Sequence, residues 1–248
     1  MAPVALVMAA ALAVPDLDLS AGLEWQAGDY GLGETTTATF APVNLSADFG
    51  AWALGLSTAW ARIDGPADVA LLDPSALRRR GQAGADEPRS GFTDVAISAE
   101  YRPPPAAAAW WALIGGATLP TGDGEKGLSS GSMDVFVIGE AGYDAEPFAV
   151  ALSVGYRITG EPGWKDPFSL AFSLRRRLGA DALAGVTMDY TQPLADGFGP
   201  QATVSLFAGR AFGPRLQADV RVWKGLSRES GDFGGGLTLR HALGAAAP

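Results

Sequence analysis

The feature that most constrains this chain is an alternation of apolar residues with small or polar ones, clearest from residue 148 to residue 158. Successive side chains of a β-strand point to opposite faces, so such a segment has one apolar face and one small or polar face. A helix would scatter the same apolar residues around its circumference. The segment is therefore predicted to be a strand with these residues on one face: Phe148, Val150, Leu152, Val154, Tyr156 and Ile158.

The same alternation recurs along the rest of the chain. Six further segments show it clearly: 17–26, 51–60, 94–102, 168–175, 216–222 and 232–240. Less regular candidates lie between them, at 35–45, 110–119, 133–143, 182–190 and 202–208. Together they predict about twelve strands, most of them near the 9–11 residues that a tilted membrane strand needs. Roughly 20 residues for each strand and its connection suit an up-and-down antiparallel meander.

The predicted connections alternate in length as well. Short turns are expected at 48–50, 103–105, 144–147, 178–181 and 212–214. Longer polar loops are expected at 27–34, 61–91, 121–132, 159–167, 192–200 and 224–231. Outer-membrane barrels have short periplasmic turns and long external loops. With an even number of strands, both ends of the chain fall on the periplasmic side and every long loop falls outside.

The polar face decides between a soluble and a membrane barrel. It consists mostly of Gly, Ala, Ser and Thr. A water-facing exterior would carry more charged side chains, whereas this composition suits an enclosed lumen. Aromatic residues near strand ends are expected to form the two interfacial girdles of a membrane barrel: Trp25, Trp52, Trp60, Tyr101, Tyr143, Tyr156 and Trp223. The prediction is an all-β, antiparallel up-and-down transmembrane β-barrel in a bacterial outer membrane. The alternative is a soluble barrel with these aromatics in its core.

Composition excludes several other classes. The chain has no cysteine, a single histidine and a net charge of −9, which argue against a cysteine-ligated metal site and a nucleic-acid surface. No catalytic residue, metal site or cofactor is predicted. An outer-membrane hydrolase would need a serine paired with His241, which is expected beside the outward Leu239 as an inert side chain.

The chain divides into three parts. Residues 1–13 resemble the apolar core and small-residue cleavage site of a secretory signal peptide, although the basic n-region is missing, so the true start is expected upstream. Residues 14–243 form the predicted barrel, and 244–248 a C-terminal tail.

Charged residues are scattered along the predicted lumen face. One interpretation is that opposite charges pair across the wall and fill the interior, as enclosed charges require. The other is that they line a path for ions or solutes. The candidates for lining the lumen are Glu24, Asp94, Glu100, Glu140, Arg157, Arg175, Asp189, Asp219, Arg221 and Arg240.

Three short strings in the middle of the chain are distinctive. Gly91-Phe92-Thr93-Asp94 begins a strand, Glu100-Tyr101-Arg102 ends it, and a loop follows with Leu119-Pro120-Thr121-Gly122-Asp123, Lys126-Gly127-Leu128, Gly131-Ser132 and Asp134. In this order they resemble a family of outer-membrane porin-like proteins described as transporters of the phenol-degradation meta pathway. The resemblance covers roughly residues 90–240. Such barrels commonly end in an aromatic residue that the assembly machinery recognises, whereas this chain ends in Pro248.

The resemblance implies a transmembrane barrel that passes small organic molecules. We therefore expect a channel for passive diffusion of small, hydrophobic or aromatic solutes, narrowed by inward side chains and by the loop 61–91. The alternative is a barrel with a plugged lumen and a structural or binding role. The expected partners are outer-membrane lipids, a small-molecule solute and the outer-membrane assembly machinery.

Overall fold

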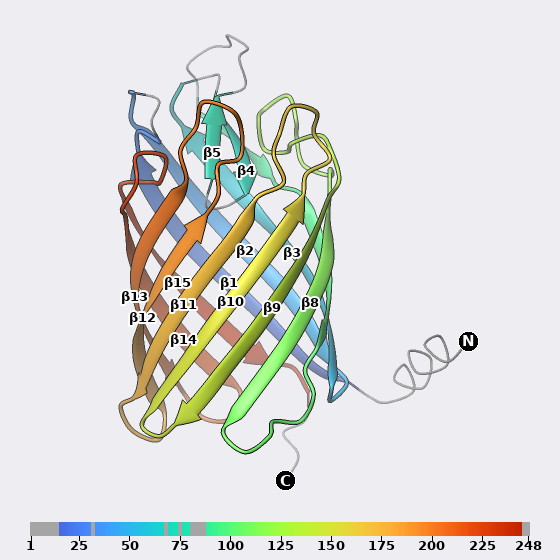
Figure 1. Ribbon diagram of the computed structural model, residues 1–248, viewed down its shortest axis with the longest axis vertical. Helices are drawn as coiled ribbons and strands as arrows, with labels where there is room; N and C mark the ends of the chain where they lie inside the picture. Colours follow the sequence, from blue (N-terminus) through green and yellow to red (C-terminus); the bar gives the residue numbers. More distant parts are fainter. Residues whose placement is uncertain (1–14, 31–32, 67–68, 74–75, 80–87, 245–248) are drawn as a thin grey trace, which may run out of the picture.

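The computed structural model describes residues 15–30, 33–66, 69–73, 76–79 and 88–244, and they form a closed antiparallel β-barrel (Figure 1). Its first strands are β1 (Asp16–Gly28), β2 (Thr36–Asp48) and β3 (Trp52–Asp64), followed in the wall by β6 (Arg89–Phe92) and β7 (Val95–Tyr101). The wall continues through β8 (Ala109–Leu119), β9 (Asp134–Ala145), β10 (Phe148–Ile158), β11 (Phe168–Arg177), β12 (Ala182–Thr191), β13 (Gln201–Ala211), β14 (Leu216–Gly225) and β15 (Phe233–Ala242).

The wall closes because β1 pairs with both β2 and β15. The large sheet contains 13 strands, but β6 and β7 occupy successive parts of one position beside β3, which leaves twelve strand positions. The remaining strands, β4 (Val69–Asp73) and β5 (Ala76–Arg79), form a separate hairpin in the connection from β3 to β6. The predicted fold class, strand number and meander order are confirmed. None of the described residues forms a helix long and apolar enough to cross a membrane.

The two ends of the barrel differ as the sequence predicts. The long connections, including the β4–β5 hairpin, gather at one end, which we call the loop end (Figure 1). The short turns lie at the other, the turn end, where β1 begins and β15 ends. The predicted signal segment 1–13 and residues 245–248 of the predicted tail lie outside the described residues.

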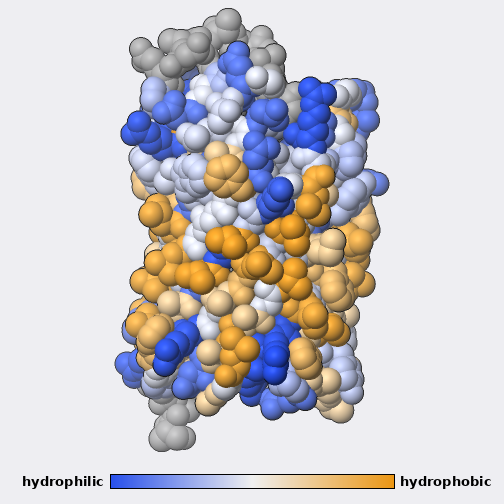
Figure 2. Space-filling view, turned by 90° about the vertical axis from the view of Figure 1, so that its left-hand side faces the viewer, coloured by the Kyte–Doolittle hydropathy of each residue, from blue (hydrophilic) through white to orange (hydrophobic). Residues whose placement is uncertain are grey.

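The apolar residues of the alternation lie on the outer face. Leu23, Leu206 and Val222 expose 59%, 60% and 58% of their surface. Figure 2 shows hydrophobic residues gathered in a band across the face in view, with hydrophilic residues towards both ends. Such a band is the surface that lipid tails cover in a membrane barrel, and it contradicts the soluble alternative, because the apolar side chains do not form the interior.

One predicted girdle residue is placed differently. Trp223 lies on the inner face, because it shares the parity of the polar Asp219 and Arg221 rather than that of the apolar Val222. Its ring lies 5.6 Å from the Arg221 guanidinium carbon. The expectation that it joins an interfacial girdle is therefore wrong. The error arose because position near a strand end was given more weight than the two-residue period of its own strand.

Candidate channel lumen

The strand registers place nine of the ten predicted lumen residues at inward positions of strands, and Asp94 in the break between β6 and β7. Most of these residues form an ion pair or a hydrogen bond with a neighbouring group. Asp94 accepts a hydrogen bond from the Gly122 amide (2.9 Å), Arg175 pairs with Asp144 (2.9 Å), and Asp219 accepts hydrogen bonds from Gln217 (2.8 and 3.0 Å). Arg240 and Glu100 line one cavity at the turn end.

Two groups of charged residues lie on different parts of the inner wall. On one side Arg221 pairs with Asp189 (3.3 Å) and interacts electrostatically with Glu24. On the other side Glu100 and Glu140 interact with each other, and Arg102 pairs with Glu100. The sequence could place these residues on one face, but only the register shows that Arg221 reaches Asp189 across β13. Each of the two groups thus contains both acidic and basic side chains.

Replacing Arg221 by Gln is expected to increase cation selectivity about two- to threefold, because it removes a positive charge that faces the carboxyl groups of Glu24 and Asp189. The permeability ratio of K⁺ to Cl⁻, measured from reversal potentials in a KCl gradient, reports the change. Arg221→Lys keeps the charge and should leave the ratio near its original value. An unchanged ratio in Arg221→Gln would show that this group does not face the conducting path.

Sequence reasoning missed the aromatic part of the lumen. Besides Trp223, the aromatic residues at inward positions include Trp110 on β8, Phe136 on β9 and Phe207 on β13. Each of these four residues stands directly opposite a glycine of the neighbouring strand, in the pairs Trp110–Gly142, Phe136–Gly116, Phe207–Gly185 and Trp223–Gly234.

These glycines let the rings lie against the wall. A Cβ added at any of the four would overlap the ring opposite to it. The rings therefore occupy the space of the missing side chains rather than the centre of the lumen. The abundance of glycine was visible in the sequence, but the pairing of each ring with a glycine needs the register.

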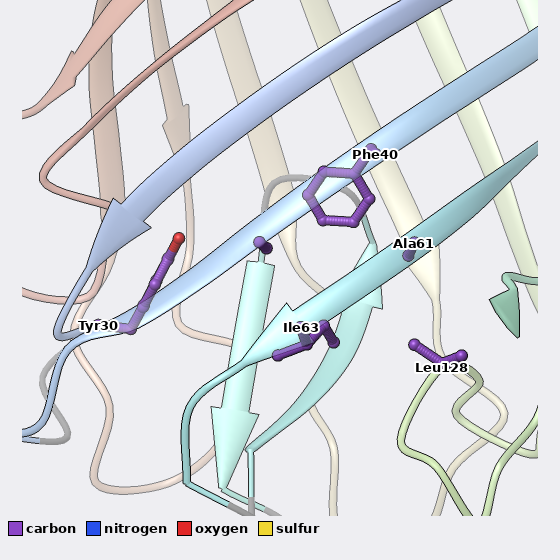
Figure 3. Packing of buried hydrophobic residues seen from close by; sticks show 6 residues of the cluster. Tyr30, Phe40, Ala61, Ile63 and Leu128 are labelled. Carbon is purple, nitrogen blue, oxygen red and sulfur yellow. The ribbon is translucent and has the colours of Figure 1, made fainter. Parts of the chain in front are cut away.

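The loop end of the lumen contains a small apolar cluster. Phe40 of β2 and Ile63 of β3 lie at inward positions with exposures of 1% and 0%, and they cluster with Ala38, Ala61, Tyr30 and Leu128. Figure 3 shows the β4–β5 hairpin (turquoise) beside this cluster, and Figure 1 places it at the same end. The hairpin lies at the same end of the lumen as these side chains. The narrowing of the lumen by the loop 61–91 stays a prediction.

The distinctive strings of the sequence meet at the break between β6 and β7. The Thr93 amide donates to the Ala59 carbonyl (2.8 Å), while the Thr93 hydroxyl accepts from the Ala59 amide (3.1 Å). On the other edge the Thr121 hydroxyl accepts a hydrogen bond from the Val95 amide (2.9 Å). Side chains thus replace missing strand partners, so the strings keep the wall continuous where the strand is interrupted.

The loop after β8 is held in shape by the same strings. A Cβ at Gly122 would lie 2.8 Å from the Leu128 carbonyl oxygen, so only glycine fits there. Asp123 accepts a hydrogen bond from the Lys126 amide (3.1 Å) and pairs with the Lys126 side chain (3.1 Å), which together hold the pKa of this carboxyl below its usual value. The loop thereby positions Leu128 in the apolar cluster. These residues are structural rather than catalytic.

His241 lies on the outer face of β15, opposite Leu19 and Leu216, and it is exposed. A residue there cannot act on a serine in the lumen.

The inner wall is hollowed in several places. A cavity of about 410 Å³ at the turn end is lined by Asp18, Asp48, Glu100, Arg102 and Arg240 among others. A second, of about 300 Å³, lies at the same end beside Arg175 and Arg177. A third, of about 310 Å³, lies towards the loop end beside Phe136 and Arg157. Solvent-sized space thus exists near both ends of the lumen.

Comparisons with known proteins agree with this architecture. A family model described as "Putative MetA-pathway of phenol degradation" matches residues 13–243. No curated protein matches the sequence.

Three solved structures are similar in fold. The COG4313 outer membrane channel from Pseudomonas putida F1 has a TM-score of 0.70 at 14% identity, with 94% of this chain and 97% of that chain covered. The KdgM porin has 0.59 at 10%, covering 92% and 99%. The CymD monoaromatic hydrocarbon channel has 0.52 at 9%, covering 94% and 90%. They confirm the predicted fold, a closed antiparallel β-barrel, and all three are named as channels or porins.

Proposed function

Because the chain belongs to this phenol-degradation pathway family, we propose that it forms a passive outer-membrane channel for small organic solutes, aromatic ones among them. The observation that carries the proposal is the composition of the inner face. It holds charged and hydroxyl side chains together with aromatic rings that lie against glycines of the neighbouring strands. Such a surface can be wetted and can also contact a ring. A relative of similar fold is named as a monoaromatic hydrocarbon channel, which supports the solute class.

The ten predicted lumen residues have different places along the proposed path. Glu24, Asp189 and Arg221, with Glu100 and Glu140 on the other wall, form the polar lining of the path. Arg157 and Asp94 lie nearer the loop end, while Arg175, Asp219 and Arg240 lie nearer the turn end. Outer-membrane lipids would contact the apolar band, and the assembly machinery would insert the barrel after export directed by residues 1–13.

Liposome swelling tests the proposal directly. Liposomes containing the purified protein should swell in solutions of small neutral solutes such as glycerol and 4-methylphenol, and planar bilayers should show discrete conductance steps. Larger solutes such as raffinose should enter far more slowly, because a barrel of twelve positions is narrower than the aqueous porins of 16–18 strands. The absence of both swelling and conductance would contradict the channel.

The alternative, a plugged barrel, is favoured by one observation, the apolar cluster of inward side chains at the loop end, beside which the β4–β5 hairpin lies. Under this alternative the lumen stays closed to solutes, and removing the hairpin does not open it.

A further inference from the structure

The third cavity, of about 310 Å³, combines groups from five neighbouring strands and two loops of the loop end. Its strand residues other than Tyr156 occupy inward positions, so it is a recess in the lumen wall. Pro167 and Leu194 contribute from the connections after β10 and β12. The full lining consists of Phe136, Ile138, Gly155, Tyr156, Arg157, Pro167, Ser169, Thr191, Leu194 and Gln201.

One side of the recess is apolar. The Phe136 ring lies over Gly116, which turns it along the wall and leaves it facing the lumen. Ile138 lies 3.5 Å from the Cβ position of Gly155, and the Ser169 hydroxyl oxygen occupies the space that a side chain at residue 155 would need. An engineered apolar cavity of ~150 Å³ binds benzene. The recess therefore has room for one aromatic ring, a substituent and water.

The other side offers hydrogen-bonding groups. Among the described residues, neither the Ser169 nor the Thr191 hydroxyl has a hydrogen-bond partner. The Gln201 amide nitrogen donates to the Glu229 carbonyl oxygen (3.1 Å), which orients the amide and leaves its oxygen as an acceptor. Two hydroxyls and one oriented amide oxygen thus face a recess whose opposite side is apolar. A solute with a ring and a hydroxyl group matches both sides.

The charges near the recess select between neutral and anionic solutes. Arg157 is the one charged residue in the lining, and it interacts electrostatically with Asp134. Asp94 and Glu161 act on Asp134 as well. Because Asp134 offsets the charge of Arg157, an anionic head group would find no uncompensated cation in the recess.

We propose that this recess is a binding site for a neutral aromatic compound with a single ring that carries a hydroxyl group. The ring would contact Phe136 and Ile138, and the hydroxyl group would form hydrogen bonds with Thr191, Gln201 and Ser169. The proposal rests on the proposed channel function and assigns the solute class to one place in the lumen. A solute would pause there below the loops before it diffuses onward.

Calorimetric titration of the full-length protein in detergent tests the site with three probes: 4-methylphenol, toluene and 4-methylbenzoate. We expect 4-methylphenol to bind at least about tenfold more tightly than the other two, because toluene lacks the hydroxyl and the benzoate is charged. The double variant Thr191→Val/Gln201→Leu should weaken 4-methylphenol about tenfold and leave toluene unchanged. Thr187→Val removes an inward hydroxyl of the same strand outside the recess, and should change nothing.

A second variant keeps the test decisive if the double variant fails to fold. Ile138→Trp fills the recess without removing a polar group, and it should abolish 4-methylphenol binding. Equal affinity for 4-methylphenol in the wild type and either variant, or tightest binding of 4-methylbenzoate, would overturn the site. Conductance is measured on the same proteins. If the wild type conducts but the variants bind 4-methylphenol as tightly as the wild type does, only the site is refuted. If the wild type does not conduct, the channel is refuted.

Discussion

Replacing Gly142 by Val is expected to push the Trp110 indole off the barrel wall and to reduce the single-channel conductance by roughly half, since small barrels have little interior space to spare. A Cβ at residue 142 would overlap the indole, and the two residues face each other directly in the register of β8 and β9. The backbone cannot move away without breaking strand hydrogen bonds, so the ring has to turn into the lumen. Overpacking of this kind costs about 1–3 kcal/mol.

The same strand offers a matched control. Gly139 lies on the outer face of β9 with open space at its Cβ position, so Gly139→Val adds the same side chain where nothing blocks it. It should conduct like the wild type. Adding Trp110→Ala to Gly142→Val removes the displaced ring and should restore conductance. If Gly142→Val and Gly139→Val conduct alike in planar bilayers, the rings do not set the width of the path.

Deleting the hairpin from Val69 to Arg79 and joining its ends with a Gly-Ser linker is expected to raise conductance several-fold. The hairpin lies beside inward side chains that have almost no exposure, so its removal opens the loop end of the lumen. Phe40 and Ile63 would then meet water. Burying such side chains contributes about 1.5–3 kcal/mol each, so thermal stability should fall as well.

Single-channel recording and swelling rates report the effect of the deletion. Inserting the same linker after Gly65 while keeping the hairpin controls for loop disturbance, and it should not change conductance. A deletion variant that stays silent in both assays supports the plugged alternative, because the lumen would then be closed elsewhere.

The wall of the barrel could be predicted from the sequence because each strand is determined by the residues of its own segment. A two-residue period states which side chains share a face, and the segment 148–158 does so without ambiguity. The parity of Glu24, Arg157 and Arg221 followed in the same way. The number of such segments gave about twelve strands, the alternating lengths of turns and loops supported an even number, and the structure agrees with both.

The remaining features depend on which residues of different strands stand opposite each other. Trp110 and Phe136 lie in segments with little alternation, and nothing local shows that each faces a glycine. The contact of Arg221 with Asp189 crosses β13 and is set by stagger between strands. The β4–β5 hairpin lies in a loop that the sequence assigned only a narrowing role. Register and long-range packing, rather than periodicity, decide these features.

The central claim is that apolar side chains face lipid while small and polar ones surround an aqueous lumen. Because the chain has no cysteine, single cysteines can be introduced and spin-labelled at Val154 and Phe172 on one face and at Ser153 and Ser173 on the other. In lipid vesicles, labels at Val154 and Phe172 should be relaxed mainly by oxygen, which concentrates in lipid, and those at Ser153 and Ser173 mainly by a water-soluble nickel chelate. Relaxation of the serine-site labels by oxygen and of the Val154 and Phe172 labels by nickel would contradict the account.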